Sequence, residues 1–411
     1  MVTKPYPILA TLLGFCLAAP NAAAQAVPER LPDWLQEAMS AESRDLIRHD
    51  VALGDGAFRS RLPGRSPANV SGIDDGWYVT TDIGSTAPLE CWVFQTDVDP
   101  ATMANNIANA SIAASAEKNG TLQSRSLYFV DMGVIEGIPF LAVEWLYRAG
   151  DAPNTVVGFS KVRVGMLGGT TVACGHNTVG YRKTFADAFA ELVNAAVVAD
   201  AGEPPDYEVV FVRRIGDQPV GLVHGTFSLD RDGDTAIRSV DSSLMPIDES
   251  NLAATDIWTI SFARPDGSLI NKVRFAIEDG ELTTNLNLKR DQQSVWTVSG
   301  VYEGKEISAA LGGDVQPIAD SGQIRAVAAL LADDEQDSAT VTAWVPQADP
   351  TQFTDIVYSL YGDGSSRGSM QLGSIRLDGQ FDANGTMREA SLDYGGEDMF
   401  IERVWQRGRL P

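Results

Sequence analysis

The chain has 411 residues, with 31 lysines and arginines against 55 aspartates and glutamates, which gives a formal net charge of −24 at pH 7. Phosphate backbones and anionic lipids repel such an excess of negative charge, so the composition argues against nucleic-acid binding. No apolar run reaches the ~20 residues that a transmembrane helix needs, which argues against a membrane span.

The first 26 residues have the parts of a secretory signal peptide. Lys4 supplies a positive charge, Ile8–Ala19 forms a short apolar core, and three alanines follow at positions 22–24. We therefore predict a signal peptide over residues 1–26, cleaved near Ala24 or Ala26. The mature chain is then expected to be soluble and to act in the periplasm or outside the cell.

Three cysteines occur in the chain, and Cys16 lies within the predicted signal peptide. A lipid-anchored cysteine is an alternative there, but Phe15 stands where such sites carry a small residue. Because exported proteins meet an oxidising environment, we predict a disulfide between Cys91 and Cys174. Free thiols, or a metal site completed by His176, are the alternatives. We expect no metal, since no fourth ligand lies nearby in the sequence.

Residues 200–206 contain two consecutive prolines and separate two regions with different patterns. A helix-like periodicity precedes this segment, and strand-like alternation follows it. We therefore predict two domains, over residues 30–199 and 207–411, joined by an extended linker at residues 200–206. Each half is long enough to form its own core.

The first domain is predicted to be an antiparallel α+β sandwich. A short leading helix is expected over Pro32–Arg48. A second helix begins at Asp99-Pro100, where Asp suits the N-cap and Pro the first helical position, and it ends at Asn119. A last helix is expected to begin with Thr184 as its N-cap. The expected strands are 76–79, 89–94, 122–130, 134–136, 140–147, and the two hairpin arms 156–167 and 170–176.

The second domain is predicted to be a strongly curled antiparallel β-meander, either a half-barrel or an open barrel, with one or two helices. Turn dipeptides such as Asp232-Gly233 and Asp279-Gly280 recur between runs in which apolar and polar residues alternate. One helix is expected over Asp320–Asp333, where apolar residues recur at helical spacing. A second is expected after Asp349-Pro350, which repeats the Asp-Pro pattern of the first domain.

A continuous apolar face is expected on this curled sheet. Val273, Phe275 and Ile277 alternate with charged neighbours, and other strands continue the pattern. If this face is concave and the helix closes it, the sheet can enclose an apolar ligand. The alternative is a solid core. The predicted ligand-binding residues are Trp258, Phe262, Phe275, Leu286 and Trp296.

Two residues are candidates for catalysis, Glu144 and His176. Alternation places Glu144 on an apolar face, where burial raises the pKa of a carboxyl that has no partner. A cross-strand ion pair with Arg163 is the alternative for this residue. His176 stands beside Cys174 at a predicted strand end, but no Gly-x-Ser-x-Gly motif accompanies it.

The order of strands and helix over Tyr207–Arg407 resembles the half-barrel-plus-helix arrangement of bacterial envelope proteins of the LolA/LolB type, although no family motif is present. This resemblance implies a carrier of acyl chains.

We therefore predict an exported envelope protein that is a non-enzymatic binding or carrier module for an apolar ligand or a protein partner, without a cofactor. Two alternatives remain open. One is an extracytoplasmic hydrolase that uses carboxylates such as Glu144 and Glu136, and the other is an envelope protein-interaction module.

Overall fold

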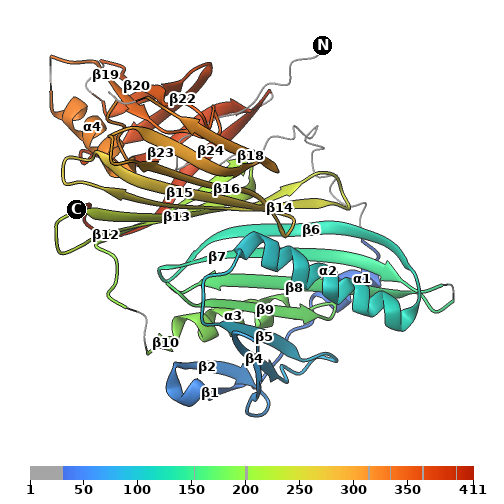
Figure 1. The fold of residues 1–411 in the computed structure, drawn as a ribbon. Helices are drawn as coiled ribbons and strands as arrows, with labels where there is room; N and C mark the ends of the chain where they lie inside the picture. Colours follow the sequence, from blue (N-terminus) through green and yellow to red (C-terminus); the bar gives the residue numbers. More distant parts are fainter. Residues whose placement is uncertain are drawn as a thin grey trace. The chain divides into compact units, whose positions relative to one another are not determined.

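The structure is a computed structural model that describes residues 31–411, except residues 152, 200, 201, 313, 314, 334, 363, 364 and 395. The predicted signal peptide lies outside the described residues, and so does part of the expected linker. The described chain is rich in β-strands, which form large antiparallel sheets (Figure 1).

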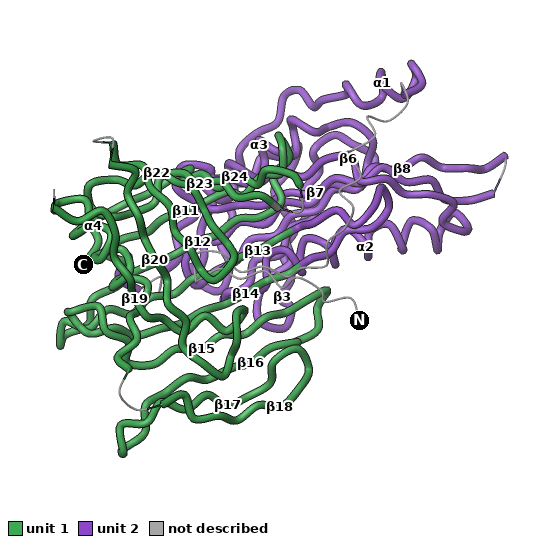
Figure 2. Tube along the Cα trace, turned by 90° about the horizontal axis from the view of Figure 1, so that it is seen from above, with its two compact units in different colours: residues 1–19, 205–243, 255–411 green, residues 20–204, 244–254 purple. Residues whose placement is uncertain are grey.

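The chain folds into two compact units (Figure 2). Among the described residues, unit 2 comprises 31–204 and 244–254, and unit 1 comprises 205–243 and 255–411. Residues 244–254 join unit 2 through hydrogen bonds to its strand β6 (Leu122–Ile135): Arg125 Nε donates to the Ser250 carbonyl at 2.6 Å, and the Leu127 N–H donates to the Glu249 carbonyl at 2.8 Å. Unit 2 therefore includes a segment that the sequence had placed in the second domain.

Unit 2 contains a seven-stranded sheet in the order β3-β4-β5-β9-β8-β7-β6 and a small sheet in the order β1-β2-β10. The strands are β1 Ile47–Leu53, β2 Phe58–Gly64, β3 Asn69–Ile73, β4 Gly76–Thr81, β5 Leu89–Phe94, β6, β7 Ile138–Ala149, β8 Val156–Met166, β9 Thr171–Asn177 and β10 Val197–Val198. The helical segments are α1 Asp33–Met39, the 3-10 turn η1 Gly54–Gly56, α2 Pro100–Asn119 and α3 Arg182–Asn194.

Helices α2 and α3 cover opposite faces of the large sheet. A Cβ atom added to Gly175 would meet Ile107 of α2, whereas one added to Gly165 would meet Phe189 of α3. These two glycines lie on opposite faces, because Gly165 pairs with Val172 and successive residues of a strand point to opposite sides. Unit 2 is thus a three-layer α/β/α sandwich. Its large antiparallel sheet agrees with the prediction, whereas helices on both faces of that sheet were not predicted.

Two expectations for helix boundaries in unit 2 were wrong. The helix expected over Pro32–Arg48 ends at Met39, and β1 begins at Ile47. Thr184 does not cap α3, which begins two residues earlier at Arg182. Instead, the carboxylate of Glu42 accepts hydrogen bonds from the N–H groups of Lys183 and Thr184, at 2.9 and 2.7 Å. A residue distant in sequence therefore satisfies N–H groups of this first turn.

Unit 1 is built on one antiparallel sheet of fourteen strands in the order β18-β17-β16-β15-β14-β13-β12-β11-β24-β23-β22-β21-β20-β19. Its elements are β11 Tyr207–Ile215, β12 Gln218–Leu229, β13 Thr235–Pro246, β14 Leu252–Ala263, β15 Leu269–Glu278, β16 Glu281–Arg290, β17 Trp296–Tyr302, β18 Lys305–Ala310, α4 Asp320–Ala332, β19 Ser338–Ala343, β20 Thr354–Leu360, β21 Arg367–Leu372, β22 Ile375–Phe381, β23 Met387–Tyr394 and β24 Glu397–Gly408.

The sheet of unit 1 curls around a core but is not a closed barrel, because among the described strands β18 and β19 end the sheet without pairing to each other. One core cluster joins strands from both ends of the sheet, for example Trp296 of β17 and Tyr358 of β20, with Ile324 of α4. The curled sheet and the helix at Asp320 agree with the prediction (Figure 1).

The second helix expected in this half was wrong. After Pro350 the chain makes a turn and enters β20 at Thr354. The Asp349 carboxylate accepts hydrogen bonds from the N–H and hydroxyl of Thr351, at 2.8 and 2.6 Å. Aspartate stabilises turns in this way as readily as it caps helices, so the Asp-Pro pattern alone does not separate the two outcomes.

Candidate functional site

The candidate site is a cavity inside unit 1, between α4 and the inner sides of β11, β12 and β20–β23. The volume of the cavity is about 50 Å³. This space holds roughly four water molecules, or a short alkyl chain. The lining residues are Tyr207, Val209, Phe211, Phe227, Asp320, Gln323, Ile324, Val327, Tyr358, Met370, Phe381, Gly385, Thr386 and Met387.

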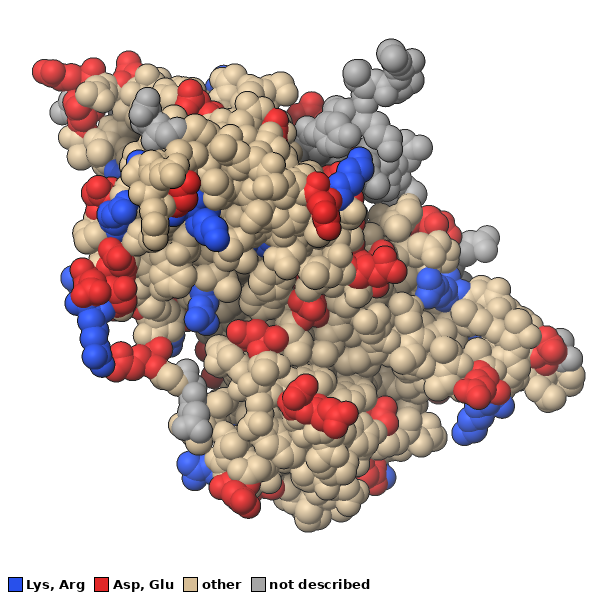
Figure 3. All heavy atoms as spheres, viewed as in Figure 1, with Lys and Arg blue, Asp and Glu red and all other residues tan. Residues whose placement is uncertain are grey.

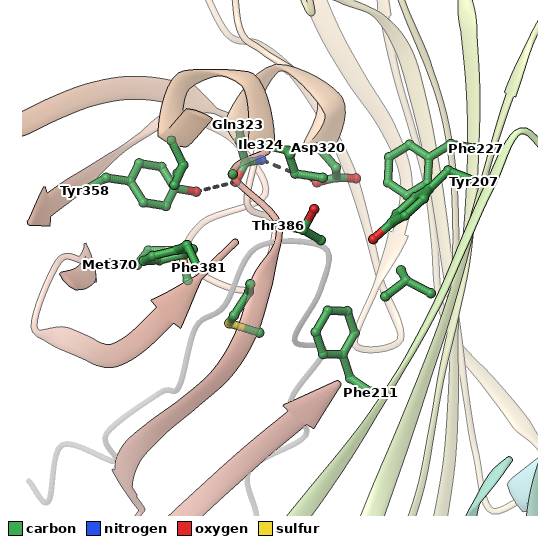
Figure 4. A pocket seen from close by; sticks show the side chains of 14 residues that line it. Tyr207, Phe211, Phe227, Asp320, Gln323, Ile324, Tyr358, Met370, Phe381 and Thr386 are labelled. Atoms are coloured by element: carbon green, nitrogen blue, oxygen red, sulfur yellow. Dashed lines mark hydrogen bonds between the residues drawn. The ribbon is translucent and has the colours of Figure 1, made fainter. Parts of the chain in front are cut away.

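Most of this lining is hydrocarbon, aromatic ring or thioether. Alternate residues of β11, namely Tyr207, Val209 and Phe211, point to the same side and form one wall. Met370 and Met387 contribute to the opposite wall (Met370 is labelled in Figure 4). Methionine side chains are unbranched and repack readily, so this wall can change its shape.

The polar groups of the cavity gather at the first turn of α4 (Figure 4). Tyr358 Oη donates to Gln323 Oε1 at 3.0 Å, and Gln323 Nε2 donates to Asp320 Oδ1 at 3.3 Å. Thr386 lies beside them and donates to Asn384 Oδ1 at 2.7 Å. Burial raises the pKa of Tyr358, and the negative charge of Asp320 adds to this effect, so the phenol stays protonated.

Two glycines allow α4 to lie close enough to form the cavity. Gly267, in the β14–β15 turn, accepts a hydrogen bond from the Ala319 N–H at 3.0 Å, and a Cβ atom on Gly267 would lie 2.5 Å from the Gly322 backbone. Gly385, in the β22–β23 turn, has φ +80°, and a Cβ atom there would lie 2.0 Å from the Ile324 carbonyl oxygen. Larger residues at either position would push the helix away.

The five predicted ligand-binding residues do not share one face, and none of them lines the cavity. Leu286 and Trp296 are fully buried in the core of unit 1. Trp258 and Phe275 are directly paired across β14 and β15, with ring centroids 6.1 Å apart, on the opposite side of the sheet. Phe262 lies on that opposite side too and is 37% exposed. The expectation of a common concave face was therefore wrong.

The inner side of β15 instead carries buried charges. Arg274 pairs with Leu286 in the ladder, so both point inward. Lys272 is also inside, with its Nζ 3.9 Å from Asp320 Oδ1. The side-chain oxygen of Gln347 faces the Arg274 guanidinium and accepts hydrogen bonds from its Nη1 and Nη2 atoms, at 2.8 and 2.7 Å. Charged residues that face a core invert the usual alternation rule, which explains the wrong assignment of faces.

Glu144 lies in β7 and is 4% exposed. Its Oε2 atom accepts from both Nε and Nη2 of Arg182, each at 2.7 Å. The expected buried carboxyl is therefore real, but its ion pair is with Arg182 rather than Arg163. Glu136 does not lie near Glu144. Glu136 is in the β6–β7 turn, and Glu144 lies roughly 20 Å along β7 from the first residue of that strand. This geometry does not form a carboxylate pair for hydrolysis.

His176 is 3% exposed and lies between aromatic rings, stacked on Phe185 at 6.2 Å. Burial, with the positive charge of Lys161 nearby, lowers the pKa of His176 to about 3. Its Nε2 atom lies 2.8 Å from Ser85 Oγ, which in turn donates to the Ala87 carbonyl at 2.6 Å. The serine proton is thus directed to a carbonyl, so the neutral imidazole donates to Ser85 and does not activate it as a nucleophile.

The predicted disulfide is confirmed: Cys91 and Cys174 are paired residues of adjacent strands β5 and β9, and their sulfurs are bonded. Because the sulfurs are used in this bond, they are not ligands of a metal site with His176. Within the described ranges, no group of three or more His, Cys, Asp or Glu side chains is placed to hold a metal ion.

Acidic side chains are dispersed over the face of the molecule seen in Figure 3 and do not gather in one patch there. None of the helices among residues that the structure describes is long and apolar enough to cross a membrane.

No model of a known protein family matches the chain, and no curated protein matches it. Among solved structures, it is similar to a β-barrel-like protein of the domain of unknown function DUF1849 from Brucella abortus, with 16% identity and a TM-score of 0.37, over 50% of this chain and 98% of that one. It is also similar to a DUF1089 family protein from Pseudomonas aeruginosa, with 16% identity and a TM-score of 0.25, over 40% of this chain and 86% of that one. This is a weak likeness, and the expected resemblance to LolA/LolB-type proteins is not established.

Proposed function

We propose that unit 1 is a binding module for a small apolar or amphipathic molecule, held in the cavity beneath α4. The observation that carries the proposal is the combination of an apolar lining with a few polar groups that converge at one place, the first turn of α4. A packed core needs no such space, because protein interiors are filled nearly as densely as organic crystals.

Export of the chain belongs to the same proposal. The signal-like sequence of residues 1–26 and the bonded pair Cys91–Cys174 both fit a protein that works outside the cytoplasm. The ligand would then be one available in the cell envelope or beyond it. Fractionation of cells that express the full-length chain tests this part. We expect the shortened, oxidised protein outside the cytoplasm, and a full-length, reduced protein in the cytoplasm would contradict export.

The binding proposal is tested with 1-pentanol as the probe, in thermal unfolding of the full chain at increasing probe concentration. A ligand that binds only the folded state at ten times its Kd stabilises it by about 1.4 kcal/mol. Val209 is 2% exposed and lines the cavity. We expect Val209→Phe to fill the cavity and abolish stabilisation by pentanol, while Val209→Ala retains it.

The two variants at one position act as controls for each other, because an effect of pentanol on the solvent or on the unfolded chain would be the same in both. If both variants and the unaltered protein respond equally, pentanol does not bind in the cavity and the proposed function is wrong.

A further inference from the structure

We infer that the ligand of this cavity carries an uncharged hydroxyl head group, which the acceptor atoms at the first turn of α4 select over a carboxylate or an ammonium group of the same chain length. This inference rests on the proposed function, since it concerns which amphiphile the cavity takes.

The hydroxyl protons around the polar end of the cavity are already used within the protein. Tyr358 donates to Gln323, and Thr386 donates to Asn384. Tyr207 Oη lies 3.3 Å from Gln406 Oε1 and donates to it. The phenol of Tyr207 also has hydrogen bonds with the Thr386 and Arg403 side chains, so its lone pairs are partly used. The oxygens of Tyr358 and Thr386 keep lone pairs that can accept another hydrogen bond. The cavity therefore offers a ligand mainly acceptors, and a head group that donates a proton fits it.

Asp320 strengthens this bias toward donors. Its carboxylate is one of the lining groups, and the hydrogen bond from Gln323 Nε2 and the ion pair with Lys272 Nζ both involve Oδ1. Among the described residues, Oδ2 therefore stays available to accept from a ligand. A ligand carboxylate has no proton to donate, so its oxygens would face the lone pairs of Oδ2 in a site with little water, and the charge of Lys272 is already engaged by Asp320.

A cationic head group is disfavoured for a different reason. The charge of Asp320 is already balanced by Lys272, whose ammonium lies 3.9 Å away and whose side chain is 6% exposed. An ammonium ion in the cavity would lose its hydration and gain no unbalanced negative charge in return. An uncharged hydroxyl group avoids both costs. It donates one hydrogen bond, and it loses much less hydration free energy than an ion does.

The test compares four probes with the same five-carbon chain: 1-pentanol, pentanoate, pentylammonium and n-pentane, each titrated into the full chain at pH 8 and followed by thermal unfolding. We expect pentanol to bind at least about tenfold more tightly than either charged probe, because leaving one buried polar group unpaired costs that much or more. Pentane, which has no head group, is expected to bind more weakly than pentanol.

Two substitutions connect this preference to the proposed atoms. Thr386 is 2% exposed, and Thr386→Val removes its acceptor oxygen with little change of shape, so the preference for pentanol over pentane should fall about threefold or more. Thr235 is fully buried elsewhere in unit 1 and does not line the cavity, so Thr235→Val is the matched control and should keep the preference. Asp320→Asn adds a hydrogen-bond donor, and we expect it to reduce the difference in affinity between pentanol and pentanoate. The Thr386 variant decides the question if the Asp320 variant does not fold.

The outcomes separate this inference from the proposed function. If all four probes bind equally, or if a charged probe binds most tightly, the hydroxyl preference is wrong while the cavity remains a binding site. An unchanged pentanol preference in Thr386→Val also contradicts the inference. If no probe binds, both the inference and the proposed function fail.

Discussion

Replacement of Glu144 by glutamine should destabilise unit 2, because it breaks a largely buried ion pair. The side chain of Glu144 is 6% exposed and that of Arg182 is 33% exposed, and both nitrogen contacts to Oε2 are 2.7 Å long. Arg182 also packs over the rings of Tyr128 and Phe129, at 5.1 and 5.3 Å, so it is held in place when its partner is removed.

The size of the effect follows from this intermediate burial. Loss of one partner from a fully buried pair costs about 3–5 kcal/mol, whereas exposed pairs contribute about 0–1 kcal/mol. With one partner buried and the other a third exposed, we expect Glu144→Gln to lower the free energy of unfolding by about 2 kcal/mol.

Asp187→Asn is the matched control, because it removes one negative charge from an ion pair on α3 whose two side chains are 76% and 62% exposed. Both variants change the net charge of −24 by one, so their effect on general charge repulsion is the same. We expect no measurable loss from the control. Urea unfolding of the full chain gives both values, and the transition that moves on reduction of the disulfide is assigned to unit 2. Equal stability of the two variants would refute a structural role for Glu144.

Two further predictions concern unit 2. The Cys91–Cys174 bond spans 83 residues, so in the chain-entropy model its removal in the double variant Cys91→Ala/Cys174→Ala should cost about 4.5 kcal/mol in urea unfolding; an unchanged midpoint would contradict this. Burial lowers the pKa of His176 to about 3, so between pH 6.5 and that value the unfolded chain binds a proton that the folded chain does not. The free energy of unfolding should therefore fall by about 2 kcal/mol from pH 7 to pH 5, and this fall should be smaller by about 2 kcal/mol in His176→Phe. An identical fall in the two proteins would show that His176 is not held neutral by the fold.

Local sequence patterns predicted those elements that local chemistry determines. Helix α2 begins at the proline expected to open it, and α4 begins at Asp320 as expected. The disulfide followed from counting cysteines in an exported chain. By contrast, the first turn of α3 is satisfied by Glu42, more than a hundred residues away in sequence, and no local pattern contains that information.

The cavity beneath α4 was harder to predict, for two physical reasons. Its lining comes from strands far apart in the sequence, such as β11 and β21, which the curl of the sheet brings around α4. Moreover, Lys272 and Arg274 point into the core, where alternation predicts apolar residues, so the aromatic side chains of β14 and β15 were assigned to the wrong face. One signal was available in the sequence: Tyr207, Val209 and Phe211 alternate on one side of a strand.

Binding in the cavity is tested most directly by a crystal of the protein soaked with 5-bromopentan-1-ol, in which anomalous scattering locates the bromine atom. We expect a bromine peak among Met370, Phe381 and Met387, with the hydroxyl group directed to Asp320 and Thr386. A bromine peak only at other places on the protein, in crystals of the unaltered chain and of Val209→Phe alike, would contradict the proposal that unit 1 binds its ligand beneath α4.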